Sequence, residues 1–267
     1  MHPTQQAAEL LDEALLSHRP VDPVRALIGS HDLAAAYRVQ SELTRRRTAR
    51  GARVVGRKVG LTSPAVQAQL GVDQPDLGVL FDEMRVEDGA VVDVARLIAP
   101  KVEAEVAFVL GADLDGDLDG DAGADRVAAA VETLAPALEV VDSRVRDWDI
   151  TIGDTVADNG SSALFVLGPA RPAGEVVAAD VVMTLEVDGR TASSGDGRAC
   201  LGDPLLALTW LARTASAFGE PLRAGDVVLS GALGPMVPVT GGEHVVATID
   251  PLGTVAVRFG GHEGDAR

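Results

Sequence analysis

Apolar residues in the N-terminal fifth of the chain recur at the spacing of one helix face. Between residues 5 and 17, the apolar residues Ala7, Leu10, Leu11, Ala14 and Leu15 lie at helical spacing, as in an amphipathic helix. The stretch HDLAAAYRVQSELTRRRTARG, residues 31–51, predicts a second helix with Asp32 as its N-cap and Gly51 as its stop. We therefore predict a helical N-terminal region over residues 1–51.

After the second helix the pattern changes to short valine-rich runs separated by Gly, Pro and Asp, which is typical of strands and turns. These runs are ARVVGRKVGL, GAVVDV, KVEAEVAFVL, ALEVVDSRV, VVMTLEVDG, GDVVLSG and GTVAVRFG. Helix start and stop signals predict two further helices, over residues 125–138 and 203–219, the second ending in a C-cap glycine. We expect one α+β domain, residues 1–267, whose catalytic region, residues 52–262, is mostly sheet. No regular βαβ alternation and no G-x-G-x-x-G after a strand are present, which argues against a dinucleotide-binding fold.

The run KVEAEVAFVL carries two glutamates on one face of its expected strand. Alternation places Glu103 and Glu105 on the same side, roughly 7 Å apart. Like charges this close repel unless a cation joins them, and their oxygens suit Mg²⁺ or Mn²⁺. An acidic, half-exposed strand face is the alternative. The same face continues as Ala107 and Val109, so we expect the glutamates at the rim of a pocket.

Two further charged residues stand in apolar or glycine-rich surroundings. Glu139, in LAPALEVVDSR, has nearly all apolar neighbours and needs a partner, a metal or a helix end that reaches solvent. Lys58, in VVGRKVGL, shares its strand face with Gly56 and Gly60, which leave room for a ligand to approach. A partly desolvated lysine near a metal would have a lowered pKa, suited to proton transfer. A surface lysine on an edge strand is the alternative.

The stretch GVDQPDLGVLF is expected to form a turn. Gln74 is held extended before Pro75, and Asp76 follows. Such a turn places a carboxylate rigidly, either in a site or as a cap on the following backbone of an ordinary loop.

Charge and cysteine usage exclude several classes of function. The net charge is −17, from 40 acidic and 23 basic residues, without a basic cluster interleaved with aromatics, so a nucleic-acid partner is not expected. The single cysteine, Cys200, allows no intramolecular disulfide and no thiolate metal cluster, which fits a reducing cytoplasm. The N-terminus lacks a basic start and an apolar core, and no run reaches the roughly 18 apolar residues of a membrane span. Neither export nor membrane insertion is expected.

Two other candidate chemistries fail on their own spacing. In the Asp-rich stretch 111–125 three aspartates fall at calcium-loop positions, but Arg126 stands where an EF-hand needs a glutamate. We expect an acidic, solvated connection there. No serine lies in G-x-S-x-G, and the five histidines lie at chain ends, in turns or, for His244, in a strand-like run. A Ser-His or Cys-His hydrolase is therefore disfavoured.

Taken with these residues, the chain from the first helix to GTVAVRFG resembles the 2-keto-4-pentenoate hydratase (2-hydroxypenta-2,4-dienoate hydratase) family of the fumarylacetoacetate hydrolase superfamily. The resemblance is carried by GRKVGLTSPAVQAQLGVDQPDLGVLF, PKVEAEVAFVLG, ALEVVDSRVRDWDITIGDTVADNGSSALFVLG and GDVVLSGAL. It implies the superfamily fold, a mixed β-sheet roll resembling the fumarylacetoacetate hydrolase C-terminal domain, with flanking helices after a helical N-terminal region.

The resemblance also implies the roles of seven residues. Glu103, Glu105 and Glu139 would bind Mg²⁺ or Mn²⁺. Lys58 and Asp76 would act on the substrate, and Ser161 and Ser230 would line its pocket.

The implied activity is metal-dependent addition of water to 2-hydroxypenta-2,4-dienoate, giving 4-hydroxy-2-oxopentanoate in meta-cleavage catabolism of aromatic compounds. A homo-oligomer is implied, with possible association with other enzymes of the pathway. Two alternatives stay open: 2-oxo-3-hexenedioate (4-oxalocrotonate) decarboxylase, and a non-catalytic partner subunit of that pathway.

Overall fold

The computed structural model describes residues 2–63, 67 and 72–261 of the chain. Its helices are α1 (Pro3–Ser17), α2 (Arg25–Ile28), α3 (Leu33–Ala49), α5 (Gly120–Ala130), α6 (Ile152–Ala157) and α7 (Pro204–Ala217). Its strands are β1 (Val54–Gly60), β2 (Asp76–Phe81), β3 (Arg85–Val86), β4 (Val91–Asp93), β5 (Lys101–Leu110), β6 (Val131–Val141), β7 (Ser162–Leu167), β8 (Arg171–Pro172), β9 (Val182–Val187), β10 (Arg190–Asp196), β11 (Val227–Ala232), β12 (Val237–Pro238), β13 (His244–Asp250) and β14 (Gly253–Gly260). Short 3₁₀ turns are η1 (Asp82–Met84), η2 (Val94–Arg96), η3 (Arg146–Trp148), η4 (Asn159–Ser161), η5 (Ala178–Asp180) and η6 (Gly197–Ala199).

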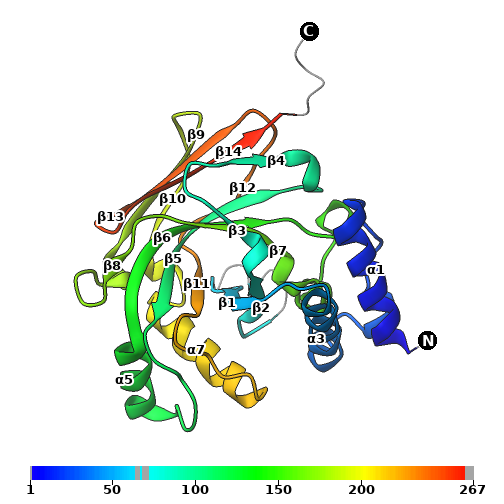
Figure 1. Ribbon diagram of the computed structural model, residues 1–267, viewed down its shortest axis with the longest axis horizontal. Coiled ribbons are helices and arrows are strands. Elements are labelled where there is room, and N and C mark those ends of the chain that lie inside the picture. The colour runs from blue at the N-terminus through cyan, green and yellow to red at the C-terminus, as the bar shows by residue number, and fades with distance from the viewer. Residues whose placement is uncertain (1, 64–66, 68–71, 262–267) are drawn as a thin grey trace.

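The strands form two mixed sheets. The larger has the order β2-β1-β11-β5-β6-β7-β3, with β12 added to β5 and β8 added to β6. The smaller has the order β10-β9-β13-β14-β4. Helices α1 and α3 lie at one end of the molecule, whereas α5 and α7 lie below the large sheet (Figure 1). The predicted mixed-sheet fold with flanking helices is confirmed.

The large sheet curls so that its two ends approach each other. Phe81 on β2 and Phe165 on β7 belong to one buried cluster, together with Ala107 of the central strand β5. Strands β2 and β7 are also in direct contact. The sheet therefore forms a roll, and this cluster fills part of its inner face.

The alternation predicted for residues 101–110 is confirmed by the packing of β5. Its even-numbered residues, from Val102 to Leu110, face the main core with α7 and the small sheet. Ala107 on the opposite face belongs to the cluster inside the roll. Glu103 and Glu105 share that inner face, because side chains two residues apart point the same way.

Two element predictions were wrong in part. The helix expected over 125–138 ends at Ala130, and residues from Val131 onward form β6. Pairing with β5 along the length of β6 overrides the helical propensity of its alanines. The turn expected around Asp76 ends sooner, since Asp76 is already the first residue of β2 and pairs with Gly60.

The helical predictions at the N-terminus are confirmed. Helix α3 begins after Asp32, whose Oδ1 accepts a hydrogen bond of 2.9 Å from the amide of Ala35. The chain leaves this helix at Gly51, where φ is +105°. The second C-cap glycine, Gly219, has φ +78° after α7.

The acidic stretch after β5 contains no calcium-loop geometry in its described residues. Arg126, in the position that an EF-hand gives to glutamate, donates hydrogen bonds to the carbonyls of Asp115 and Asp117. Arg223 pairs with Asp113 and Asp115. The exposed connection continues into α5, which the sequence analysis placed five residues too late.

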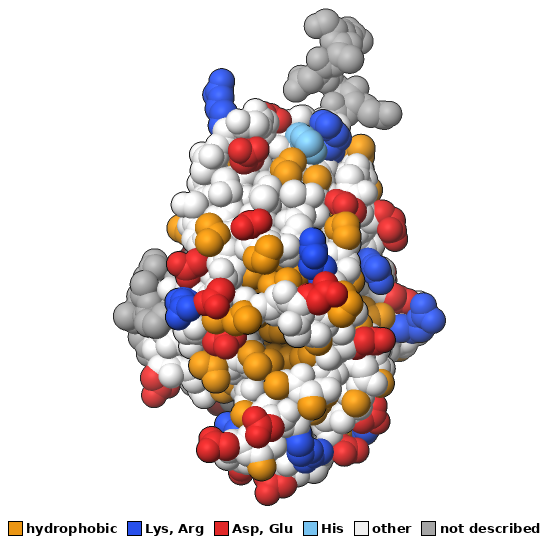
Figure 2. Space-filling model, turned by 90° about the vertical axis from the view of Figure 1, so that its left-hand side faces the viewer, with side chains coloured by type: hydrophobic (Ala, Val, Ile, Leu, Met, Phe, Trp, Pro, Cys, Tyr) orange, Lys and Arg blue, Asp and Glu red, His pale blue; other side chains and the backbone are white. Residues whose placement is uncertain are grey.

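The face drawn in Figure 2 shows how charge is distributed on one side of the molecule. Its Lys and Arg side chains stand singly among acidic ones, and apolar side chains gather in a central hollow. Among the described residues, no helix is long and apolar enough to cross a membrane.

We predict that Asp32→Ala destabilises the chain by about 1 kcal/mol, because the first turn of α3 loses its side-chain acceptor. Asp32→Ser keeps an acceptor and should restore most of that stability. Urea unfolding of both variants measures the effect. Equal midpoints for the wild type and Asp32→Ala would show that the cap contributes nothing.

Candidate metal centre

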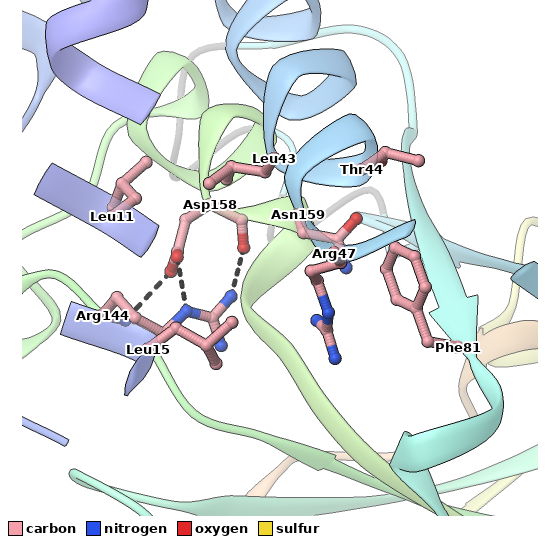
Figure 3. A pocket seen from close by; sticks show the side chains of 9 residues that line it. All are labelled: Leu11, Leu15, Leu43, Thr44, Arg47, Phe81, Arg144, Asp158 and Asn159. Carbon is pink, nitrogen blue, oxygen red and sulfur yellow. Dashed lines mark hydrogen bonds and ion pairs between the residues drawn. The ribbon is translucent and has the colours of Figure 1, made fainter. Parts of the chain in front are cut away.

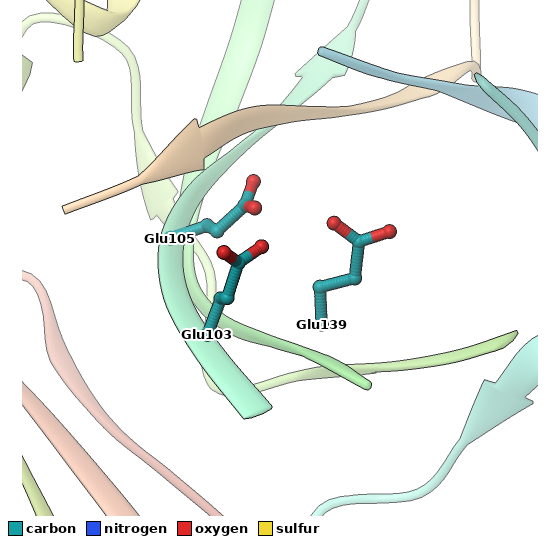
Figure 4. Close-up of side chains that lie close together, drawn as sticks. All are labelled: Glu103, Glu105 and Glu139. Carbon is teal, nitrogen blue, oxygen red and sulfur yellow. The ribbon is translucent and has the colours of Figure 1, made fainter. Parts of the chain in front are cut away.

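Pairing of β5 with β6 brings three carboxylates together inside the roll. Glu103 lies directly opposite Glu139 in the antiparallel register, and Glu105 lies two pairs further along, opposite Ala137. One carboxylate oxygen from each of the three glutamates lies within 4.8 Å of the others. Figure 4 shows all three carboxylates directed into the same space. We call Glu103, Glu105 and Glu139 the carboxylate cluster.

The carboxylate cluster lacks the hydrogen bonds that buried oxygens normally have. Glu105 and Glu139 are fully buried. Oε1 of Glu105 and both carboxylate oxygens of Glu139 have no hydrogen-bond partner. Buried carboxylates without partners are strongly disfavoured unless a cation joins them. Three convergent oxygen donors fit Mg²⁺ or Mn²⁺, and the helix-end alternative for Glu139 is excluded by its place in β6.

Burial and mutual repulsion shift the titration of this cluster. Burial, followed by the charge of Glu139, raises the pKa of Glu103 to about 7. The same two causes raise the pKa of Glu105 well above its usual value. Both shifts mean that the ionised form lacks compensation from the protein alone, as expected of ligands for a cation.

Gly231 holds the orientation of Glu105. Its amide donates a hydrogen bond of 2.6 Å to Oε2 of Glu105. Gly231 has φ +108°, and a Cβ there would come within 2.5 Å of the Thr62 side chain. The sequence analysis missed this role, although a glycine directly after the GDVVLS strand was a visible signal of a bulge.

Lys58 and Asp76 lie on neighbouring strands at the edge of the carboxylate cluster. Nζ of Lys58 is 3.5 Å from Oε2 of Glu139, and both side chains are buried. A Cβ on Gly60 would lie 2.1 Å from Oδ1 of Asp76 and 3.2 Å from Nζ of Lys58. Both groups therefore flank Gly60, and the surface-lysine alternative is wrong.

Gly60 and Gly56 leave room for protein atoms rather than for a ligand, which corrects the interpretation of these glycines. A Cβ on Gly60 would collide with the carboxylate of Asp76, and one on Gly56 would collide with the carbonyl of Val227 on β11. The first allows Asp76 to approach Lys58, and the second allows two strands to approach closely.

Burial and neighbouring charges also shift the pKa values of Lys58 and Asp76. Burial lowers the pKa of Lys58, but the surrounding carboxylates, Glu139 foremost and then Asp76, outweigh burial and raise it. Burial raises the pKa of Asp76 against the opposing effect of Lys58. The lowered lysine pKa expected from the sequence therefore requires a bound cation that offsets the carboxylate cluster.

The two serines are buried and already bonded within the protein. Oγ of Ser161 donates to Oδ2 of Asp158 at 3.3 Å. Oγ of Ser230 donates to the carbonyl of Gly231 at 3.3 Å, next to the amide that holds Glu105. Their part in binding substrate remains a prediction.

A buried ion pair behind the site was not anticipated. Arg144 donates to Asp158 through Nε at 2.5 Å and through its backbone amide at 3.0 Å, and both side chains are nearly inaccessible. In Figure 3 this pair lies beside a small pocket lined by Leu11 and Leu15 of α1 and by Leu43 of α3. A larger cavity of about 480 Å³ is lined by these helical ends and by β3 and β4, but not by the carboxylate cluster.

We predict that Glu103→Gln lowers the affinity for Mn²⁺ by more than about tenfold, because the cluster loses an anionic ligand. Glu132→Gln, on the exposed start of β6, is the matched control and should bind Mn²⁺ like the wild type. Isothermal titration calorimetry measures both. Unchanged Mn²⁺ binding in Glu103→Gln would remove this residue from the ligand set.

We also predict that Mn²⁺ affinity rises as pH increases from about 6 to about 8, since protons compete with the cation for Glu103 and Glu105. Raised carboxyl pKa values mean that protons are bound near neutral pH and are released when the cation binds. Calorimetry in buffers of different ionisation enthalpy measures this release. Affinity independent of pH, without proton release, would contradict the assignment.

Comparison with known proteins identifies the family. The family model described as Fumarylacetoacetate (FAA) hydrolase C-terminal matches residues 53–259. A "TodF product hydratase" of Pseudomonas putida is 52% identical over 257 residues, covering 96% of this chain and 94% of the relative. A "2-keto-4-pentenoate hydratase" of Paraburkholderia xenovorans is 48% identical over 257 residues with the same two coverages.

Among solved structures, 4-oxalocrotonate decarboxylase from Pseudomonas putida G7, complexed with magnesium and adipate, superposes with a TM-score of 0.91. It is 36% identical, and the match covers 96% of this chain and 97% of that one. The chain belongs to the fumarylacetoacetate hydrolase family.

Proposed function

We propose that the chain is a divalent-metal-dependent hydratase that adds water to 2-hydroxypenta-2,4-dienoate and yields 4-hydroxy-2-oxopentanoate. The observation that carries the proposal is the buried carboxylate cluster with the ammonium of Lys58 3.5 Å from Glu139. The hydratase relatives match 96% of the chain, so the proposal concerns nearly all of it.

The carboxylate cluster would hold Mg²⁺ or Mn²⁺, and the cation would polarise the oxygen at C2 of a bound 2-hydroxydienoate or 2-oxoenoate. Lys58 and Asp76 supply two buried groups that exchange protons next to this position. The reaction needs a proton moved from the 2-hydroxyl and one delivered to C5, followed by attack of water at C4 and protonation at C3. We assign these transfers to Lys58 and Asp76 as a pair.

Burial of the two groups contributes to this chemistry. The side chain of Lys58 is 5% exposed, and Asp76 is buried beside it. Exclusion of bulk water strengthens the interactions of the ammonium with charge that develops on the substrate. It also limits attacking water to molecules that enter with the substrate.

A second candidate function is 4-oxalocrotonate decarboxylase, favoured by the TM-score of 0.91 with that enzyme. Sequence identity favours the hydratase, since the two hydratase relatives are 48% and 52% identical and the decarboxylase is 36% identical. A non-catalytic partner subunit is disfavoured, because unpaired buried carboxylates destabilise a fold that makes no use of them.

We further propose that the reaction belongs to the catabolism of aromatic compounds in the cytoplasm and is performed by a homo-oligomer that associates with other enzymes of that pathway. The single cysteine, Cys200, is buried and free, which suits a reducing compartment. Size-exclusion chromatography with light scattering measures the number of subunits.

The first test mixes the purified protein with freshly generated 2-hydroxypenta-2,4-dienoate and Mg²⁺ or Mn²⁺ and follows loss of the dienol absorbance. We expect rapid decay to 4-hydroxy-2-oxopentanoate, abolished by EDTA and restored by excess metal. Carbon dioxide release from 2-oxo-3-hexenedioate, without decay of the dienol, would instead identify the decarboxylase. No reaction with either substrate would indicate a non-catalytic partner subunit or an enzyme with another substrate.

We predict that Lys58→Met lowers kcat by at least about 100-fold, because one of the two proton-transferring groups is lost. Mn²⁺ affinity should stay within a few-fold of the wild type, since Lys58 is not a ligand. Lys101→Met is the matched control, because Lys101 lies over the ring of Trp148 at 4.0 Å and takes no part in the proposed transfers. Full activity of Lys58→Met would exclude this residue from the mechanism.

A further inference from the structure

Three consecutive residues next to Lys58 adopt left-handed backbone conformations. In η4 the φ values are +56° for Asn159, +61° for Gly160 and +53° for Ser161. Residues other than glycine rarely adopt this conformation, and such strain persists where the surrounding structure enforces it, often at functional sites. We call residues 159–161 the left-handed turn.

Side-chain hydrogen bonds fix the left-handed turn on both sides. Asn159 holds β2, because its Oδ1 accepts from the amide of Val79 at 2.8 Å and its Nδ2 donates to the carbonyl of Val79 at 2.9 Å. Asp158, directly before the turn, is anchored by Arg144 and accepts from Ser161 at 3.3 Å. Figure 3 shows the contacts between Arg144 and Asp158, with the side chain of Asn159 close by.

The left-handed turn packs directly on the side chain of Lys58. A Cβ on Gly160 would come within 2.6 Å of Cε and 3.1 Å of Nζ of Lys58. On β2, a Cβ on Gly78 would come within 3.1 Å of Cγ of Lys58 and 2.7 Å of the carbonyl oxygen of Asn159. The lysine side chain therefore passes two glycines, Gly78 and Gly160, at positions where a larger residue would crowd it.

We infer that the left-handed turn is a positioning element for Lys58, with Gly160 and Asn159 as its positioning residues. Gly160 allows the turn to close on Cε, and Asn159 ties the turn to β2, so the ammonium is held toward Glu139. The consequence for catalysis rests on the proposed function, in which Lys58 moves a proton. Proton transfer depends on placement, and a shift of about 1 Å can lower a rate by about 100-fold.

The lysine content of the chain permits a test that does not depend on activity. Lys58 and Lys101 are the two lysines of the sequence. Protein carrying ¹³Cε-labelled lysine therefore gives two NMR signals, which Lys101→Arg assigns. Gly160→Ala should shift the Lys58 signal and leave the Lys101 signal in place.

Gly189→Ala is the matched control. Gly189 has φ +72°, close to that of Gly160, but a Cβ there meets no atom within 4 Å. The variant therefore imposes the same backbone strain without contact with Lys58, and neither lysine signal should move. We expect kcat of Gly160→Ala to be at least about tenfold below that of Gly189→Ala. KM and Mn²⁺ affinity should stay within about threefold of the control, because a positioning residue touches neither substrate nor cation.

Asn159→Asp provides a second variant if Gly160→Ala does not fold. Aspartate tolerates the left-handed conformation and keeps the acceptor for Val79 but loses the donor. The Lys58 signal should again shift and kcat should fall.

The outcomes separate this inference from the proposed function. A Lys58 signal that stays in place in both variants, or variants as active as Gly189→Ala, would overturn the positioning role. A shifted Lys58 signal in a protein whose wild type does not hydrate the dienol would support the positioning role and reject the proposed hydratase.

Discussion

The close approach of three carboxylates, two of them fully buried, is the constraint on which the rest of this structure depends. Two like charges about 4 Å apart repel by about 4 kcal/mol at an effective dielectric constant of 20. The register of β5 and β6 enforces that proximity, because Glu103 and Glu139 are directly paired residues and Glu105 lies two residues along the same face. The pairing of the two central strands therefore holds mutually repelling carboxylates together, and the ammonium of Lys58 offsets only part of their negative charge. A divalent cation is the species that satisfies the remainder.

Glycines let the backbone bring these charged side chains so close together. Asp76 occupies the space that a Cβ on Gly60 would fill, and Lys58 occupies the space that a Cβ on Gly160 would fill. The amide of Gly231 donates a hydrogen bond to Glu105. At each of these positions the missing side chain leaves space that a neighbouring functional group occupies. The glycines therefore shape the site as much as the larger residues do. The buried pair of Arg144 and Asp158 then holds the segment from which Gly160 approaches.

The sequence was sufficient for features that depend on local periodicity. Alternation along residues 101–110 correctly placed Glu103 and Glu105 on one face, and helical spacing with Asp32 and Gly51 correctly bounded α3. It failed where pairing between distant strands decides the outcome. The alanines before Glu139 favour a helix locally, but pairing with β5 makes them a strand.

The same limit applies to the site. The sequence named Lys58, Asp76 and the carboxylate cluster, partly through resemblance, but their mutual distances follow from strand order. Strands β11 and β5 lie between β1, which carries Lys58, and β6, which carries Glu139, so the two side chains meet across the curled sheet. The left-handed turn was missed although Asp-Asn-Gly at 158–160 is a strong local signal for φ > 0. The positioning role that we infer for this turn depends on Lys58, which lies about a hundred positions earlier in the chain. The Asp-Asn-Gly sequence alone therefore predicts the backbone conformation but not the contact with Lys58.

The likeness to both hydratases and a decarboxylase has a physical explanation in this arrangement. The proposed substrates of the two reactions share one end, a carboxylate next to an oxygen at C2, and differ at the other end. A cluster of three carboxylates with a cation recognises only the shared end, because its donors are oxygens that contact the cation rather than the carbon chain. The proton transfers that we propose for Lys58 and Asp76 are equally general, since proton transfer to or from a conjugated 2-oxo acid serves both reactions. Selection between hydration and loss of carbon dioxide must therefore come from groups that face the far end of the substrate, and a high similarity of the central cluster carries little information about that choice.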